Sequence, residues 1–242
     1  SPGNYAVRLD DTNIDVSLTV SHRSGMHRYV FSEGAEQVVI LDLAHRDRVL
    51  DAEVFIEENQ FISGHRFSKA WAEDQRLFFD LTFSRPFTKV TLLDGKTKGE
   101  NVKAAFEFDR SETNILEVGI GISAVDKAGA RKNRIAELKD KTFDQLSKEA
   151  DAIWEKQLNK VVVETYKEED KYNFYSALYH TMIAPNLYQD VDGRYRGMDM
   201  KIHQNSDTEY YTVFSLWDTY RAAHPLYTLI EQERTNDFIN TF

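Results

Sequence analysis

The sequence contains no cysteine among its 242 residues. This absence excludes disulfide bonds, and it also excludes metal sites that are built from thiolates. A chain without disulfides is compatible with the cytosol and with a bacterial envelope protein that does without such bridges. Cysteine usage therefore leaves the compartment open.

An excess of basic charge is also absent, because 30 lysine and arginine residues face 40 aspartate and glutamate residues and the net charge is -10. Binding to nucleic acid requires a basic surface that neutralises phosphates and releases counterions. The sequence has no patch that is rich in lysine or arginine. We therefore do not expect nucleic acid as a partner.

Long apolar runs are missing as well, since no stretch approaches the roughly 20 residues that a transmembrane helix needs. We expect no transmembrane segment. The opening residues Ser1-Pro2-Gly3-Asn4 have neither the basic region nor the apolar region of a signal peptide. Any signal peptide is therefore expected to have been removed.

The composition that remains is typical of a soluble globular protein, with 41% hydrophobic, 29% charged and 12% aromatic residues. The length allows one large domain or two smaller ones. Aromatic side chains can stack on sugar rings, but they more often fill protein cores. Composition alone therefore favours a core role for most of the aromatic residues.

Residues 5–124 follow a period of two, which is typical of half-buried β-strands. In residues 14–20, Ile14, Val16 and Leu18 alternate with polar residues. Turn signals such as Asp94-Gly95 and Ser111-Glu112 separate the short segments. The predicted strands are 14–20, 37–43, 53–56, 61–67, 76–83, 89–93, 103–108 and 115–122. Many short strands at close spacing predict a β-sandwich or a barrel in residues 1–124.

Residues 125–160 have a different character and predict two helices, at 126–138 and 143–158. Thr142 is the predicted N-cap of the second helix. Charged residues alternate with an apolar stripe, so one face packs and the charge-rich run 139–156 forms the solvated face. The predicted stripe consists of Phe143, Leu146, Ala150, Ile153 and Gln157. We interpret residues 125–160 as a helical linker.

Residues 161–242 begin with a predicted short strand at 161–164. A second helical stripe follows and ends before Pro185, because proline disfavours helix in the preceding residue. This stripe consists of Tyr172, Tyr175, Leu178, Tyr179 and Met182. Turn residues interrupt the segment 188–211, and residues 215–230 are again predicted helical, with a disturbance at Pro225. These broad apolar helix faces need further neighbours to close a core, so we expect a chain that is truncated at its C-terminus.

A glycine motif at residues 119–124 has the spacing of a dinucleotide-binding fingerprint. However, Gly119 and Gly121 alternate with apolar residues inside a predicted strand, and no βαβ unit follows. Small residues inside a strand more often mark a place where another layer approaches closely. We therefore predict close packing at these glycines and no nucleotide site.

Two further patterns suggest metal binding but have simpler interpretations. Asp190-Val191-Asp192-Gly193 resembles the start of a calcium loop, yet the remaining ligands of such a loop are missing. A hairpin turn through Asp192-Gly193 is the preferred interpretation. The histidines at positions 180, 203 and 224 are too scattered for a zinc pattern. We predict no metal-ligating residue.

The segment that stands out begins at Ser215 and contains adjacent Trp217 and Asp218. An indole can cover the apolar face of a sugar ring while a neighbouring carboxylate accepts hydrogen bonds from two hydroxyls. A structural alternative explains the same residues, because Ser215 and Asp218 have capping-box spacing and Trp217 could belong to the core. The residues alone leave both interpretations open.

The wider sequence resembles glycoside hydrolase family 92. Similar segments occur in the same order along the whole chain, and the combination is more specific than any single motif. The segments are Gly25-Met26-His27-Arg28-Tyr29, Ala70-Trp71-Ala72 with Gln75, Phe83-Ser84-Arg85-Pro86-Phe87, Tyr175-Ser176-Ala177-Leu178-Tyr179-His180-Thr181, Tyr195-Arg196-Gly197-Met198-Asp199, and Ser215-Leu216-Trp217-Asp218-Thr219-Tyr220-Arg221 with His224-Pro225-Leu226.

This resemblance implies an antiparallel β-sandwich of the supersandwich type in residues 1–124, a helical linker in 125–160 and the first helices of an (α/α)6 catalytic barrel in 161–242. The sandwich is expected to lack its first strands, because the family's β-domain begins upstream of the part that Ser1-Pro2-Gly3 matches. Members of the family are calcium-dependent, inverting exo-α-mannosidases. Inversion implies a general acid on the leaving oxygen and a general base that activates water.

By the same resemblance, Trp217 and Asp218 correspond to residues that bind the terminal mannose. The catalytic acid and base and most calcium ligands are expected downstream of Phe242, so no catalytic or metal residue is assigned to this chain. The implied substrate is terminal α-linked mannose on glycans such as N-glycans, with α-1,2 as the expected linkage. The implied location is the bacterial periplasm or the outside of the cell. Oligomeric state is not implied.

Two alternatives stay open at the level of the sequence. One is another glycosidase or a glycoside phosphorylase with an (α/α)6 barrel, because fold alone does not fix chemistry. The other is a non-catalytic carbohydrate-binding or assembly module that uses the β half. The leading hypothesis is a fragment of an α-mannosidase that is itself inactive.

Overall fold

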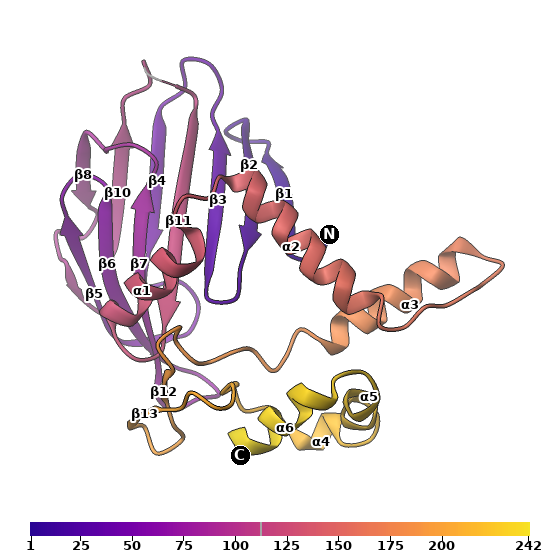
Figure 1. The fold of residues 1–242 in the computed structure, drawn as a ribbon. Helices are drawn as coiled ribbons and strands as arrows, with labels where there is room; N and C mark the ends of the chain where they lie inside the picture. Colours follow the sequence, from indigo (N-terminus) through magenta and orange to yellow (C-terminus); the bar gives the residue numbers. More distant parts are fainter. Residues whose placement is uncertain (112) are drawn as a thin grey trace.

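The computed structural model describes residues 1–111 and 113–242. Glu112, which belongs to the turn predicted at Ser111-Glu112, lies outside the described residues. Antiparallel sheets form the first part of the chain and helices form most of the second part (Figure 1). This order confirms the predicted fold class. The described residues contain no closed helical barrel.

Two antiparallel sheets make the β part. The larger sheet has eight strands in the order β1-β2-β3-β11-β7-β6-β5-β9, and the smaller has three in the order β4-β10-β8. The strands are β1 (Asn4–Leu9), β2 (Ile14–Val20), β3 (Ser24–Val30), β4 (Gln37–Asp42), β5 (Arg48–Glu57), β6 (Phe61–Lys69), β7 (Gln75–Phe83), β8 (Lys89–Leu92), β9 (Lys98–Gly99), β10 (Lys103–Phe108) and β11 (Ile115–Ser123). The sequence prediction omitted β1, β3 and β9. The last of these is only two residues long, and β3 contains a glycine and two basic side chains that obscure its alternation.

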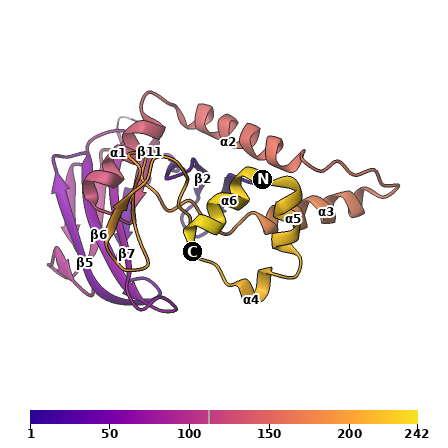
Figure 2. The ribbon, with the colours of Figure 1, turned by 60° about the horizontal axis from the view of Figure 1, so that its bottom comes forward.

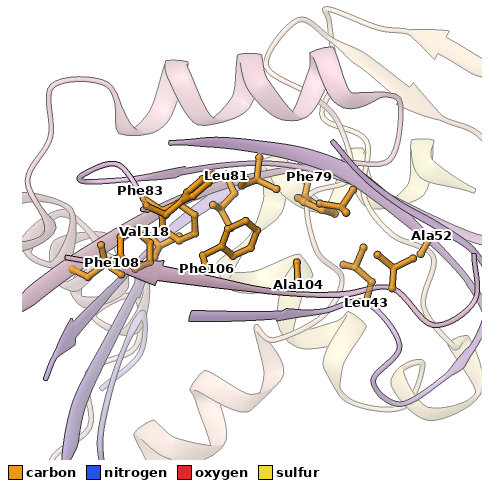
Figure 3. Packing of buried hydrophobic residues seen from close by; sticks show 14 of the residues in the cluster. Leu43, Ala52, Phe79, Leu81, Phe83, Ala104, Phe106, Phe108 and Val118 are labelled. Atoms are coloured by element: carbon orange, nitrogen blue, oxygen red, sulfur yellow. The ribbon is translucent and has the colours of Figure 1, made fainter. Parts of the chain in front are cut away.

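The core of the sandwich lies between these two sheets. Phe83 of β7 contacts Phe106 and Phe108 of β10, with ring centroids 5.4 and 4.9 Å apart. Leu116 and Val118 of β11 are buried beside them. Figure 3 shows Phe83, Phe106, Phe108 and Val118 packed together between the sheets. In strands such as β10, buried residues alternate with partly exposed ones, which is why the period of two predicted such strands.

Helix α1 (Lys127–Leu138) packs on the outer face of the larger sheet, opposite the core. Its N-cap is Asp126, whose side chain accepts a hydrogen bond from the backbone N–H of Gly129. A Cβ atom at Gly121 of β11 would overlap the backbone carbonyl of Ala130 in this helix. Gly121 therefore permits the close approach of a second layer, as predicted, whereas a Cβ atom at Gly119 would meet only ordinary contacts.

Helix α2 (Phe143–Leu158) has the predicted bounds and the predicted N-cap. Thr142 and Gln145 form a reciprocal capping box. The N-terminal half of the apolar stripe is buried, and Phe143 and Leu146 form a cluster with Met26 and Leu138. The prediction is wrong at Ile153, which is 42% exposed. This residue lines a cavity, together with Val20 at the end of β2.

The predicted strand at residues 161–164 is wrong, because these residues form no ladder with any described strand. Apolar alternation there has no partner strand to supply hydrogen bonds. Helix α3 (Glu168–Thr181) follows and ends before Pro185, as predicted. Only Leu178 of its stripe is buried, and Tyr172 is exposed.

A hairpin of β12 (Arg194–Arg196) and β13 (Ile202–Gln204) fills the segment that was predicted to be rich in turns. Gly193 has a φ of +81° and its N–H donates to the carbonyl of Asp190 at 2.9 Å. The Asp190 N–H in turn donates to the Arg194 carbonyl at 2.8 Å. The predicted hairpin turn through Asp192-Gly193 is therefore confirmed.

Three helices end the chain: α4 (Leu216–Thr219), α5 (Ala223–Ile230) and α6 (Gln232–Thr241). The sequence predicted one helix over 215–230, disturbed at Pro225, and did not predict α6. The break falls one turn earlier, between Thr219 and Ala223, because a proline ring collides with the carbonyl four residues before it. Pro225 itself occupies the first turn of α5, where its missing N–H is not needed. Among the described residues, no helix is both long and apolar enough to cross a bilayer.

Candidate functional site

Trp217 and Asp218 lie on the one-turn helix α4, near the C-terminal end of the chain (Figures 1 and 2). The indole of Trp217 is 88% exposed, and Asp218 is also exposed. An indole has a large apolar face, and an exposed apolar face in water is unfavourable unless a partner covers it. The pair is thus presented outward, with the aromatic face and the carboxylate next to each other.

The structural alternative for these residues is not formed. Ser215 is the N-cap of α4 but makes no side-chain capping hydrogen bond in the structure. Instead, the Thr219 hydroxyl donates to the carbonyl of Ser215 at 2.9 Å. Asp218 therefore does not serve a capping box, and Trp217 is not a core residue. The sugar-binding interpretation of both residues remains a prediction.

Helix α4 is held in place by aromatic residues on either side of it. Phe214 lies 4.9 Å from the ring of His224 and 5.9 Å from that of Phe238. His224 also makes a 2.8 Å hydrogen bond with the Thr219 hydroxyl. Tyr211 is buried against Phe238 of α6. The short helix is thus fixed at both ends, although its own side chains are exposed.

A second exposed indole belongs to Trp71, in the loop between β6 and β7, and its side chain has no cover at all (101% exposed). The loop is fixed on one side by Asp74, whose carboxylate accepts a 2.8 Å hydrogen bond from Arg76. That guanidinium lies over the ring of Phe67. In the sequence, Trp71 stands out only as part of the family resemblance, which assigns it no role. Its exposure could not be inferred, because a tryptophan in a β-rich segment is usually buried.

A cavity of about 350 Å³ lies where the sandwich, α2 and the C-terminal helices meet. Ile153 and Trp154 of α2 line one side, and Tyr211 and Glu231 line the other. Burial and hydrogen-bond donation to Glu209 both raise the pKa of Tyr211. Glu231 is buried and accepts a hydrogen bond from Lys160 at 2.5 Å. The cavity does not include Trp217 or Asp218, so it is separate from the exposed pair.

The three histidines from the sequence analysis lie apart and have ordinary roles. His203 makes a 2.9 Å contact with Asp199 and stacks on Tyr195, and His180 is exposed. Within residues 1–111 and 113–242, no group of three or more histidine, aspartate or glutamate side chains could hold a metal ion. These residues therefore do not fit a calcium site.

The carboxylates of the calcium-like motif are occupied by other partners. Asp190 accepts hydrogen bonds from Ser123 and Asn133, at 2.7 and 2.8 Å. Asp192 pairs with Lys132 at 2.8 Å and with Arg194 at 3.0 Å. Their oxygens are thus directed into the protein, and the motif serves to attach the hairpin to α1 and β11.

Comparison with known protein families gives two matches that together span almost the whole chain. Residues 1–123 match the glycosyl hydrolase family 92 N-terminal domain, and residues 129–242 match the glycosyl hydrolase family 92 catalytic domain. The two matches meet near the end of β11. No curated protein matches the sequence.

Comparison with solved structures finds an α-mannosidase of family GH92, BT3965 of Bacteroides thetaiotaomicron. It superposes with a TM-score of 0.92 at 32% identity, over 100% of this chain and 34% of that chain. The same enzyme in complex with mannoimidazole gives a TM-score of 0.91 at 32% identity, with the same coverage. An inverting GH92 mannosidase of that bacterium, BT2199, gives 0.88 at 24% identity, over 100% of this chain and 34% of that chain. The chain spans about a third of the length of these relatives.

Proposed function

The chain belongs to glycosyl hydrolase family 92, and on this premise we propose that it forms part of an exo-acting, inverting α-mannosidase that removes terminal α-linked mannose from glycans. The observation that carries the proposal is the match of both family domains along one chain. The 32% identity to a structure solved with mannoimidazole supports mannose as the sugar. A preference for α-1,2 linkages belongs to the same proposal.

We propose that the chain divides into a β-sandwich at residues 1–124, a helical linker at 125–160 and the start of the catalytic domain at 161–242. The change from strands to helices after β11 supports the first boundary. The second boundary is supported by the end of α2 at Leu158 and by the extended residues that follow it.

Trp217 and Asp218 bind the terminal mannose in this proposal. The exposed indole offers an apolar face for the ring, and the adjacent carboxylate accepts hydrogen bonds from two neighbouring hydroxyls. Sugar hydroxyls donate strongly to a carboxylate, because such bonds are charge-assisted. The buried residues on either side of α4 would keep the pair in place while the sugar binds.

The catalytic acid and base lie in the rest of the protein in this proposal. An inverting glycosidase needs two carboxyl groups about 6.5–9.5 Å apart, with one protonating the leaving oxygen and the other activating water. We assign neither role to a residue of this chain. Calcium dependence is part of the proposal, with ligands outside these residues. The proposed setting is the bacterial periplasm or the cell exterior.

Binding of mannoimidazole to the 242-residue chain tests the sugar-binding residues. We expect Trp217→Ala and Asp218→Asn each to weaken binding about tenfold, which corresponds to about 1.4 kcal/mol. Tyr166→Ala is the matched control, because Tyr166 is an equally exposed aromatic residue outside α4. Equal affinities in all three variants would remove both residues from the proposed site.

Turnover measurements test whether the catalytic acid and base lie outside this chain. We expect no hydrolysis of an aryl α-mannoside by the chain with calcium present. A rate near that of a complete family member would contradict the absence of the acid and base. For the complete protein, a requirement for phosphate would favour a phosphorylase, and mannoside binding by residues 1–124 alone would favour a carbohydrate-binding module.

A further inference from the structure

The hairpin of β12 and β13 lies at the end of the sandwich where β11 passes into α1, and the C-terminal helices follow it in the chain (Figures 1 and 2). Its attachment uses polar and charged side chains that are almost completely buried. Asp190 is 4% exposed, Arg196 is 9% exposed and Asn133 of α1 has no exposed surface. Burying such groups is unfavourable unless each finds hydrogen-bond partners.

Asp190 joins three elements at one carboxylate. Oδ2 accepts from the Ser123 hydroxyl at the end of β11, at 2.7 Å, and Oδ1 accepts from Nδ2 of Asn133 in α1, at 2.8 Å. Asn133 returns a second bond, because its Oδ1 accepts from the backbone N–H of Val191 at 2.9 Å. Gly129 of α1 packs so closely on this carboxylate that no side chain could be added there. Contacts from β11 and from α1 thus fix the position of the turn at residues 190–193, which precedes β12.

Arg196, the last residue of β12, makes a second attachment. Its Nε donates to the carbonyl of Ala124 at 2.9 Å and one terminal nitrogen donates to the carbonyl of Val125 at 3.2 Å. The other terminal nitrogen donates to the carbonyl of Met200 at 2.7 Å, across the hairpin. Arg194 adds a 2.7 Å ion pair with Asp126, the N-cap of α1. The fork of Arg196 therefore holds the backbone that links β11 to α1.

Backbone hydrogen bonds connect the segment before the hairpin to the segment that leads to Trp217. The N–H of Tyr188 donates to the carbonyl of Tyr210, and the N–H of Thr212 donates to the carbonyl of Asn186, both at 2.8 Å. The N–H of Tyr211 donates to the Thr241 hydroxyl of α6 at 3.1 Å. The attachment at Asp190 and the helix α4 are thus linked by paired backbone over a short path.

We propose that Asp190 and Arg196 are positioning residues, which fix the orientation of the segment carrying Trp217 and Asp218 relative to the β-sandwich. The link to sugar binding rests on the proposed function, whereas the link to orientation rests on the contacts alone. Buried polar groups of this kind contribute little net stability, but each has only one arrangement that satisfies all its partners. Their effect is therefore to select one geometry of the two parts of the chain.

A distance measurement between spin labels tests this inference directly. Because the native chain has no cysteine, Ala72→Cys in the β6–β7 loop and Glu233→Cys in α6 give two exposed labelling sites without a background signal. The doubly labelled chain that keeps Asp190 should give one narrow distribution of label-to-label distances. Asp190→Ala should broaden it and shift it, while the helix content by circular dichroism stays unchanged.

Matched variants separate the hydrogen bonds from the charge. Asp190→Asn can still accept from Asn133 and can donate to the Ser123 hydroxyl, so it should keep the narrow distribution. Asp207→Ala removes an exposed carboxylate from the segment between the hairpin and α4. This variant should also keep the narrow distance distribution. If Asp190→Ala fails to fold, Ser123→Ala removes only one of the two hydrogen bonds and should broaden the distribution to a smaller degree.

The outcomes decide the inference without reference to catalysis. An unchanged distribution in Asp190→Ala, or in Ser123→Ala when the former does not fold, would overturn it, and so would equal broadening in Asp207→Ala. A parallel titration with mannoimidazole, under conditions in which the variant is fully folded, should show about tenfold weaker binding for Asp190→Ala. Failure of the native chain to bind mannoimidazole would count against the proposed function, and the distances would still decide the positioning role.

Discussion

Replacing Asp80 with asparagine should destabilise the attachment of α1 to the sandwich more than any surface change. Asp80 lies on β7 and has no exposed surface. Its carboxylate accepts from Nε of Arg131 at 2.9 Å and from Nε of Arg134 at 2.5 Å, both on α1. Asparagine keeps the volume but removes the charge that these two guanidinium groups share.

The two arginines contribute unequally to the expected loss. Removing one partner of a buried ion pair typically costs about 3–5 kcal/mol, because the other charge is left buried and unpaired. The side chain of Arg131 is 42% exposed and keeps its 2.6 Å ion pair with Glu57. Water and Glu57 therefore offset most of the loss of its ion pair with Asp80. The side chain of Arg134 is only 12% exposed. We therefore expect a loss of about 2–3 kcal/mol, dominated by Arg134.

Urea unfolding followed by far-UV circular dichroism measures this loss as a shift in the midpoint. The control is Asp15→Asn, whose 3.1 Å pair with Arg8 has both side chains more than half exposed. Asp15→Asn should lower the free energy of unfolding by less than about 0.5 kcal/mol, and this difference should disappear at high salt. A loss below about 1 kcal/mol for Asp80→Asn would refute the reasoning. So would strict additivity with Arg134→Gln in a double-mutant cycle.

Three further predictions concern neighbouring elements. Gly121→Ala should cost about 1–3 kcal/mol, because the new methyl overlaps α1, whereas Gly119→Ala meets only ordinary contacts and should cost less in the same urea assay. Burial raises the pKa of Asp126, but hydrogen bonds from Arg194 and a backbone N–H outweigh it and hold the pKa below its usual value. The carboxylate therefore stabilises the fold above its unfolded-state pKa and loses this effect as the pH falls, so urea midpoints between about pH 6 and 3 should fall further for the native chain than for Asp126→Asn. Thr142→Ala should remove about 1 kcal/mol by breaking the capping box, again measured by urea unfolding, and no change would contradict the assigned cap.

Features set by local chemistry were predictable from the sequence. Helix α2 was placed with its correct bounds, because Thr142 supplies a cap and the apolar residues recur at helical spacing. The hairpin turn at Asp192-Gly193 was predicted because only a few residue types favour a positive φ. The family resemblance added what no local pattern contains, namely the proposal that Trp217 and Asp218 bind sugar.

Features that depend on distant partners were not predictable. Residues 161–164 alternate as a strand does, but they form no ladder with any described strand. Ile153 has the right spacing for burial, yet it is 42% exposed because it lines a cavity. Trp71 and Trp217 are likewise exposed because no described part of the chain packs over their side chains. Asp80 gave no sequence signal, because its two arginines are more than fifty positions away.

The order of strands in the larger sheet has a consequence for how the protein acquires its structure. β11 is the last strand of the sandwich to be synthesised, yet it lies between β3 and β7 in the middle of the sheet. Until it is inserted, the segments on either side each present an open edge, and open edges invite pairing with other chains. Closing the sheet also requires contacts between residues far apart in sequence, which slows folding. A nascent chain that stalls before β11 is thus the species most exposed to aggregation, and the emergence of Ile115–Ser123 is the step that ends this risk.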